Sequence, residues 1–111
     1  MLAISAVLPA YNEEATIGAV VERVLAVDLP AAREVIVVND GSRDGTRAVL
    51  DVLGRTHPDL VIVHVPVNQG KGHAVRLGIT RTRGTVVTMQ DADLELDPAE
   101  IAGLVAPILD G

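Results

Sequence analysis

The sequence contains no cysteine, tryptophan or phenylalanine, and Tyr11 is its only aromatic residue. Without cysteine the chain can form neither a disulfide framework nor a thiolate metal site, which fits a reducing compartment such as the cytoplasm. Hydrophobic residues make up 49% of the chain and are almost all alanine, valine, leucine and isoleucine. The core must therefore be aliphatic, and this composition favours a buried sheet covered by helices.

Positive charge is also scarce, with nine lysine and arginine residues against fifteen aspartate and glutamate residues and a formal net charge of −6. The basic residues are scattered and a negative chain repels a phosphate backbone, so we expect no nucleic-acid partner. No apolar run approaches the roughly 20 residues that span a bilayer, and the first residues lack the positive region of a signal peptide. We therefore expect a soluble, cytoplasmic chain.

What the sequence does contain is a regular alternation of apolar runs and amphipathic segments. A length of 111 residues suits one core and is too short for two, so we expect a single domain over residues 1–111. Short β-branched runs predict four strands, at residues 3–8, 35–38, 61–65 and 85–89. Helical spacing predicts helices in the segments 17–25, 44–53, 74–80 and 97–108. Alternating strands and helices predict an α/β, Rossmann-like fold, a parallel sheet with helices on both faces.

Three local signals set the expected ends of these elements. Pro9 closes the first strand, Asp44 is a plausible N-cap of the second helix, and Asp97 begins the last one. The last helix has proline at its first position and a capping-box glutamate at Glu100.

Polar residues follow each predicted strand. In an open α/β sheet ligands bind outside the carboxyl ends of the strands, so these residues should converge on one rim. They are Tyr11, Asn12, Glu13 and Glu14, then Asn39, Asp40, Gly41 and Ser42, then Asn68, Gly70 and Lys71, and finally Asp91, Asp93 and Glu95.

Asp91 and Asp93 are two residues apart, which places both carboxylates on the same side of an extended chain. Two hard carboxylates suit Mg²⁺ or Mn²⁺, and such an ion would keep positions open for diphosphate oxygens. Glu95 continues the same spacing. The alternative is a solvated turn and N-cap cluster, which is the commoner meaning of an isolated Asp-x-Asp.

Single residues at the other strand ends leave two interpretations open. Lys71, between two glycines, either neutralises a phosphate or belongs to a simple turn. Asp40 either accepts hydrogen bonds from a base or ribose, or serves the turn that Asn-Asp-Gly-Ser favours. Tyr11 is either a core filler or a surface on which a nucleobase stacks. We expect structural or solvent-exposed roles for the three dispersed histidines, His57, His64 and His73.

Four segments in order, 7–14 (VLPAYNEE), 37–46 (VVNDGSRDGT), 68–72 (NQGKG) and 90–93 (QDAD), resemble the family 2 glycosyltransferases. The segments look most similar to the dolichyl- or polyprenyl-phosphate mannosyl- and glucosyltransferase branch, and the resemblance covers essentially the whole chain. It implies a GT-A fold that binds a nucleotide-diphosphate sugar. Aspartyl-nucleophile phosphatases place their Asp-x-Asp after the first strand, and NAD-binding domains need the G-x-G-x-x-G that is absent here.

The resemblance implies a nucleotide site built by the first two segments. Pro9, Tyr11 and Glu13 would contact the nucleotide, Asp40 the base or ribose, and Val38 would line the base pocket. The family often has aspartate at position 39, where this chain has asparagine.

The resemblance also implies a metal site. The segment Asp91-Ala92-Asp93 would hold the donor diphosphate through Mg²⁺ or Mn²⁺, with Glu95 as a further ligand where relatives often have glutamine. Lys71 would help to stabilise the charge on the departing nucleoside diphosphate.

The implied activity is an inverting transfer of a hexose from a UDP- or GDP-linked sugar to a polyprenyl phosphate or another glycan or lipid acceptor. In the full-length protein it would take place at the cytoplasmic face of a membrane. Relatives continue past the Asp-x-Asp helix, so we expect this chain to be a truncated, donor-binding portion without an identifiable catalytic base. An edge left uncovered would allow homo-oligomers. The alternative is a nucleotide- or metal-binding module without transferase activity.

Overall fold

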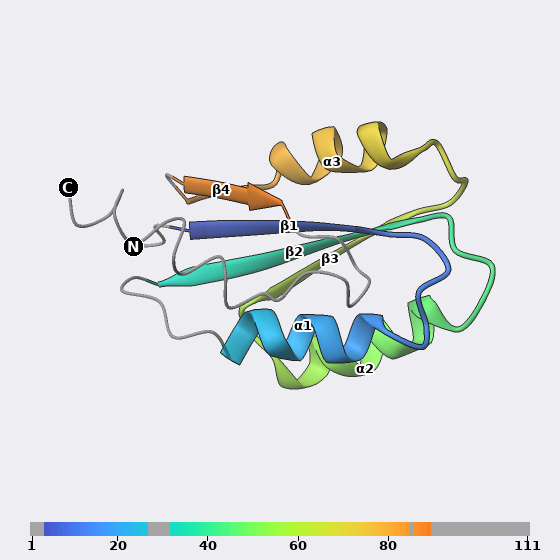
Figure 1. The fold of residues 1–111 in the computed structure, drawn as a ribbon, viewed down its shortest axis with the longest axis horizontal. Coiled ribbons are helices and arrows are strands. Elements are labelled where there is room, and N and C mark those ends of the chain that lie inside the picture. Colours follow the sequence, from blue (N-terminus) through green and yellow to red (C-terminus); the bar gives the residue numbers. More distant parts are fainter. Residues whose placement is uncertain (1–3, 27–31, 85, 90–111) are drawn as a thin grey trace.

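The four apolar runs form strands of one parallel sheet, as the alternating pattern predicts. The structure, a computed structural model, describes residues 4–26, 32–84 and 86–89 (Figure 1). Within that part the sheet order is β3-β2-β1-β4, and every neighbouring pair is parallel. The strands are β1 (Ile4–Ala10), β2 (Arg33–Asp40), β3 (Leu60–Val65) and β4 (Val86–Met89). The helices are α1 (Ile17–Ala26), α2 (Thr46–Thr56) and α3 (Lys71–Ile79).

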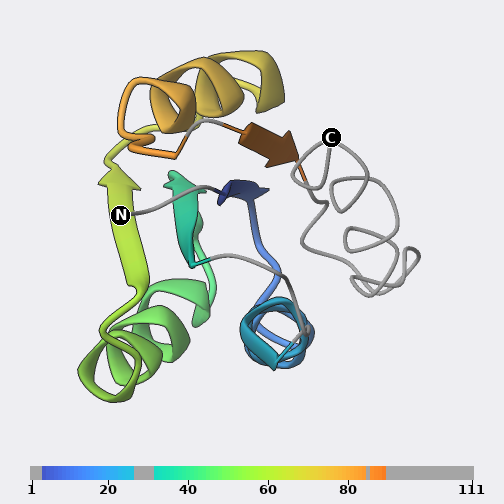
Figure 2. The same cartoon turned by 90° about the vertical axis from the view of Figure 1, so that its left-hand side faces the viewer.

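Helices cover both faces of the sheet, which confirms that prediction. α3 lies on one face, and α1 and α2 lie on the other, as Figure 2 shows from the end of the strands. Strand residues point alternately to the two faces. In β2, Val35 and Val37 pack with α1 and α2, whereas Ile36 and Val38 pack below α3.

The core is aliphatic and lies mainly between the sheet and the pair α1 and α2. Ile17 and Leu50 are fully buried there, and each such side chain stabilises the fold by about 1.5–3 kcal/mol. The core below α3 is smaller, and a close helix-to-sheet approach accounts for part of that difference. A Cβ at Gly78 would lie 2.5 Å from Cγ1 of Val7 and 3.2 Å from Cγ2 of Val38.

Several expected boundaries are wrong by one to three residues, and β2 extends two residues beyond each predicted end, from Arg33 to Asp40. β1 does not end before Pro9 but continues to Ala10. In the described part of the chain, Val7 is the last residue of β1 that pairs with β4, and Pro9 lies beyond it. Proline lacks a ladder N–H and is tolerated near strand ends. Gly45, and not Asp44, is the N-cap of α2.

α3 begins at Lys71, three residues before the predicted start, since the N–H of Ala74 already donates to the carbonyl of Gly70 (3.1 Å). Because glycine disfavours helices, the glycines at positions 70 and 72 predict a loop here. Gly70 has a φ of 97°, which turns the chain sharply into the helix. The predicted helix beginning at Asp97 lies outside the described residues.

Candidate functional site

The polar segments that follow β1, β2 and β3 meet at the carboxyl edge of the sheet, on the right-hand side of Figure 1. The expected convergence is confirmed for these three strand ends. We call this edge the carboxyl rim and define it by residues 11–16, 40–46 and 66–71.

Hydrogen bonds join the first rim segment to the second. The backbone N–H of Asn12 donates to Oγ of Ser42 (3.0 Å), and the N–H of Arg43 donates to Oδ1 of Asn12 (2.8 Å). The N–H of Glu13 donates to Oγ1 of Thr46 (2.9 Å). Asn12 has a φ of 53°, a left-handed conformation that asparagine tolerates better than most residues. These reciprocal contacts fix the conformation of the loop that carries Tyr11 and Glu13.

Asp40 joins the second rim segment to the third. Its Oδ1 accepts the N–H of Gln69 (3.0 Å), and its Oδ2 accepts the N–H of Gly70 (2.9 Å) and Nδ2 of Asn68 (3.1 Å). The same amide nitrogen of Asn68 also donates to the carbonyl oxygen of Asp40 (3.1 Å). Asp40 is only 2% exposed, so these bonds satisfy a carboxylate that burial would otherwise destabilise.

Gly41 allows the second and third segments to approach each other closely. It has a φ of 68°, and a Cβ at this position would overlap the backbone nitrogen of Asn68 and lie 2.6 Å from the carbonyl carbon of Val67. Any other residue would be strained in this conformation and would push the two loops apart. The Asp-Gly pair therefore shapes the rim through both the aspartate carboxylate and the missing side chain.

Asp44 stabilises the turn into α2. Its Oδ1 accepts both the N–H (2.9 Å) and the hydroxyl (2.6 Å) of Thr46, and its Oδ2 accepts the N–H of Glu14 (3.4 Å). Burial alone raises the pKa of Asp44, but the bonds from Thr46 and Glu14 outweigh it and hold the pKa below its usual value. Asp44 is thus ionised at neutral pH and stabilises the start of the helix from one position before the N-cap.

Asn39 faces away from Asp40 and begins a chain of side-chain contacts. Its Nδ2 lies 3.0 Å from Nδ1 of His64, and Nε2 of His64 lies 3.0 Å from Oδ1 of Asp51 on α2. The expected structural role of His64 is confirmed. No local sequence pattern indicates these contacts, because their members are 13 to 25 residues apart and share no periodicity.

The structure places the predicted nucleotide contacts in different environments. Tyr11 is at the rim with 43% of its surface exposed, so it is not a core filler. Pro9 and Glu13 are half-buried, and Oε2 of Glu13 accepts the hydroxyl of Thr16 (3.0 Å). Val38 is fully buried below α3, so the structure does not bring it to the surface of the rim.

Lys71 is exposed at the first position of α3, next to the loop that Asp40 holds. The predicted metal ligands Asp91, Asp93 and Glu95, together with Ala92, lie outside the described residues. Within the described residues no group of three histidine, cysteine, aspartate or glutamate side chains could hold a metal ion. A membrane-spanning helix is likewise absent from the part of the chain that the structure describes.

Comparisons of the sequence agree with this architecture. Residues 5–111 match the family described as glycosyl transferase family 2. A dolichyl-phosphate beta-glucosyltransferase of Trichomonas vaginalis is 36% identical over 97 residues, which cover 81% of this chain and 30% of the relative. A dodecaprenyl-phosphate galacturonate synthase of Rhizobium johnstonii is 38% identical over 110 residues, covering 96% of this chain and 32% of the relative.

Solved structures show the same fold. A glucosyl-3-phosphoglycerate synthase of Mycobacterium tuberculosis, in complex with Mn²⁺, UDP and glucosyl-3-phosphoglycerate, has a TM-score of 0.79 and 34% identity. The match covers 99% of this chain and 40% of the synthase. A mannosyltransferase of Pyrobaculum calidifontis, in complex with GDP-Man and Mn²⁺, has a TM-score of 0.72 and 29% identity, covering 81% of this chain and 27% of that protein.

The parallel sheet, the two helical layers and these neighbours define an α/β protein with the GT-A glycosyltransferase fold. The chain belongs to glycosyl transferase family 2. It spans about a third of the length of the curated relatives described above, which is the part that carries the carboxyl rim.

Proposed function

We propose that this chain is the donor-binding part of an inverting, metal-dependent glycosyltransferase that uses a nucleotide-diphosphate sugar. The observation that carries the proposal is the hydrogen-bonded rim, in which residues 40–46 hold the segments after β1 and β3 in one fixed arrangement. The carboxyl ends of the parallel strands are where this class of sheet binds nucleotides. Family membership supports the same activity.

In this proposal the nucleotide lies along the rim. Tyr11, being exposed, offers an aromatic face to the base, while Pro9 and Glu13 approach the nucleotide from the same loop. Asp40 has one acceptor position left on Oδ1 for a base or ribose, because its other positions are used by the 68–70 loop. Lys71 contributes positive charge toward the diphosphate from the start of α3.

The metal belongs to Asp91, Asp93 and Glu95. β4 is parallel to β1 and therefore runs toward the carboxyl rim, and these carboxylates follow Met89 in sequence. A donor set made only of carboxylate oxygens fits Mg²⁺ or Mn²⁺. Such an ion, when bound, neutralises charge on the diphosphate leaving group. The relatives in complex with Mn²⁺ and UDP or GDP-Man support this assignment.

For the acceptor we propose a polyprenyl phosphate at the cytoplasmic face of a membrane, with a hexose as the transferred sugar. The relatives named for dolichyl and dodecaprenyl phosphate support this choice. A phosphate acceptor is already an anion near neutral pH, so it needs no strong general base. The reaction is then a single displacement in which the rim residues hold the donor still while the acceptor oxygen attacks the anomeric carbon.

Titration calorimetry with UDP and GDP, each with Mn²⁺ and with EDTA, tests the proposal. We expect one of the two nucleotides to bind more tightly with Mn²⁺, and Asp93→Ala to remove that gain while Asp59→Ala, in an exposed turn, retains it. If neither nucleotide binds with metal present and Asp93→Ala changes nothing, the site assignment is wrong. Radiolabelled sugar transfer from UDP-glucose or GDP-mannose to undecaprenyl phosphate then separates a transferase from a module that only binds the nucleotide.

A further inference from the structure

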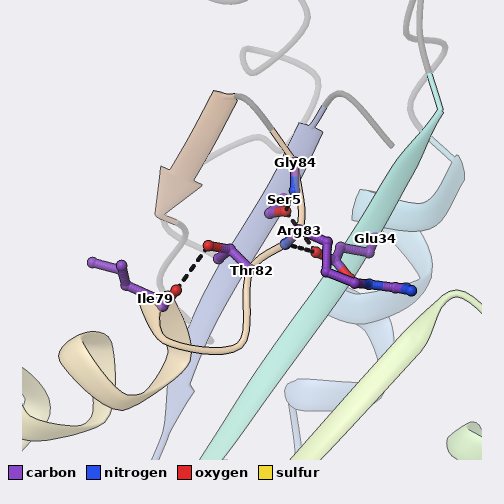
Figure 3. Close-up of polar contacts among 6 residues, drawn as sticks. All are labelled: Ser5, Glu34, Ile79, Thr82, Arg83 and Gly84. Carbon is purple, nitrogen blue, oxygen red and sulfur yellow. Dashed lines mark hydrogen bonds and ion pairs between the residues drawn. The ribbon is translucent and has the colours of Figure 1, made fainter. Parts of the chain in front are cut away.

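A buried carboxylate lies at the opposite end of the sheet, where the proposed donor site makes no use of it. Glu34, at the start of β2, is only 1% exposed, and its partners are Ser5 of β1 and Arg83 in the connection from α3 to β4 (Figure 3). We call Ser5, Glu34, Arg83 and Gly84 the amino-end cluster. It joins both central strands to the segment that leads into β4.

Both carboxylate oxygens of Glu34 and the hydroxyl of Ser5 have hydrogen-bond partners within the cluster. The hydroxyl of Ser5 and the backbone N–H of Arg83 both donate to Oε2 of Glu34 at 2.7 Å, and Nε of Arg83 donates to Oε1 at 3.2 Å. The N–H of Gly84 donates to Oγ of Ser5 at 2.8 Å. Consecutive backbone amides at positions 83 and 84 are therefore fixed by side chains of β2 and β1.

The connection is fixed from its other side as well. The hydroxyl of Thr82 donates to the carbonyl of Ile79 at 2.7 Å, which ties the connection to the last turn of α3 (Figure 3). A Cβ at Gly84 would lie 2.9 Å from the carbonyl carbon of Ile4 and from the nitrogen of Ser5. The chain can therefore approach β1 so closely only with glycine at this position.

The connection leads into β4, the edge strand of the sheet in the described part of the chain. Within the described residues β4 has four residues and pairs only with β1, from Ile4↔Val86 to Val7↔Met89. So short an edge strand has few ladder bonds of its own, and a slip of one residue would turn every side chain to the opposite face. Asp91 and Asp93 follow Met89 by two and four residues in the sequence.

We propose that the amino-end cluster is a positioning device for the metal ligands: it sets the register of β4 and thereby where Asp91 and Asp93 enter the rim. Well-packed apolar residues could stabilise this end of the sheet equally well. The paired Glu34 carboxylate and the Ser5 hydroxyl instead accept only one alignment of the amides at 83 and 84, so together they specify where the connection lies. The proposal rests on the donor and metal site proposed above.

Glu34→Gln tests the proposal, since glutamine keeps the size of the side chain and loses the carboxylate that accepts from Ser5 and Arg83. The readout is the metal enhancement, defined as the ratio of the nucleotide Kd in EDTA to the Kd in Mn²⁺, measured with UDP and GDP. We expect Glu34→Gln to lower this ratio by about tenfold, the scale of losing the outer partners of metal ligands, and to leave the Kd in EDTA unchanged within about twofold. Amide exchange should accelerate in β4 and not in β2.

Leu53→Ala is the matched control because Leu53, a residue of α2, is buried between that helix and the sheet, on the side of the molecule away from β4. It lowers stability without touching the cluster, so its metal enhancement should equal that of the wild type. If Glu34→Gln does not fold, Ser5→Ala replaces it with the same expected result. A folded variant with the wild-type ratio overturns the proposal, and so does an equal loss in Leu53→Ala.

Failure of the proposed function gives a different result. If the wild-type protein binds neither nucleotide with Mn²⁺, the donor site is wrong, and the exchange comparison alone decides whether the cluster positions β4. Faster exchange confined to β4 in Glu34→Gln then supports the cluster's role in the strand register, while uniform exchange overturns it.

Discussion

The carboxylate of Asp40 accepts the backbone N–H of Gly70 at 2.9 Å, which locks the end of β2 to the start of α3. The two residues are 30 positions apart, and the bond lies in the middle of the carboxyl rim. A residue expected to touch the nucleotide therefore also shapes the loop that leads to Lys71. The contribution of Asp40 to nucleotide binding therefore includes holding this loop in place.

Asp40→Asn should weaken the rim even though the side chain keeps its size. One carboxylate oxygen becomes an NH₂ group, which cannot accept from the N–H of Gln69 or Gly70, so one of these backbone donors loses its bond to the buried side chain. We expect a loss of about 1–3 kcal/mol in the free energy of unfolding, measured by urea denaturation. Amide exchange at positions 69 and 70 should accelerate.

Asp59→Asn provides the control for that variant, because Asp59 is exposed and loses the same charge. Its unfolding free energy should stay within about 0.5 kcal/mol of the wild type. Equal stability of Asp40→Asn and Asp59→Asn would show that the 68–70 loop does not depend on Asp40.

Gly41→Ala should destabilise the protein by at least about 2 kcal/mol, since a left-handed conformation costs an alanine roughly 1–2 kcal/mol and the added Cβ overlaps the backbone at Asn68. Gly72→Ala is the matched control. It lies inside α3, where the nearest atom to its Cβ would be Nη1 of Arg76 at 3.8 Å, and alanine favours helices by about 1 kcal/mol. Thermal unfolding of both variants should move Tm in opposite directions. A Gly41→Ala protein as stable as the wild type would contradict the close approach of the two loops.

The fold could be predicted largely from local patterns. Strand and helix periodicities identify all seven described elements, and the alternation of strand and helix fixes the parallel sheet. The start of α3 could not be predicted in this way. Gly70 and Gly72 disfavour a helix locally, whereas the bonds from Asp40 to the 69 and 70 amides orient the chain for one.

The site was only partly predictable. The convergence of three strand ends follows from parallel topology, and Tyr11, Asp40 and Lys71 lie at that rim as expected. Which side chains join the segments depends on the face to which each residue points, and on which helix covers that face. Asn39 and Asp40 are neighbours in sequence, yet one contacts β3 and the other the loop before α3. The contacts of Glu34 span 29 and 49 residues, so no local pattern indicates them.

His64 should carry its proton on Nε2 when it is neutral. Oδ1 of Asn39 accepts the N–H of Ser42, so Nδ2 is the group that donates to Nδ1 of His64, and Nε2 is left to donate to Asp51. Long-range ¹H–¹⁵N correlation spectra at pH 8 distinguish the two tautomers. A proton on Nδ1 would contradict this direction of donation.

The ring of His57 makes no hydrogen bond within the described residues and serves as an internal reference in the same spectra. It should show the mixture of tautomers that is typical of a solvated imidazole, in contrast to the single form expected for His64.

Stability should fall on acidification through the amino-end cluster. Burial raises the pKa of Glu34, but the bonds from Ser5 and Arg83 and the charge of Arg83 outweigh burial, so the folded-state pKa lies below the usual value. The unfolded chain therefore binds this proton first as pH decreases, and the stabilisation is complete above the unfolded-state pKa and lost as pH falls through the folded-state pKa. We expect the free energy of unfolding to decrease between about pH 5 and pH 3.

Urea denaturation at pH 7, 5, 4 and 3 measures this dependence in the wild type, in Glu34→Gln and in Glu22→Gln, whose carboxylate is exposed on α1. Glu34→Gln should be less stable at pH 7 and should lose less stability on acidification, because the group that takes up the proton is absent. Some dependence should remain in that variant, since the pKa of Asp44 is also lowered. The stability of Glu22→Gln should change with pH as that of the wild type does. If the stability of Glu34→Gln also falls in parallel with the wild type, the ionised Glu34 carboxylate does not contribute to the pH dependence of stability.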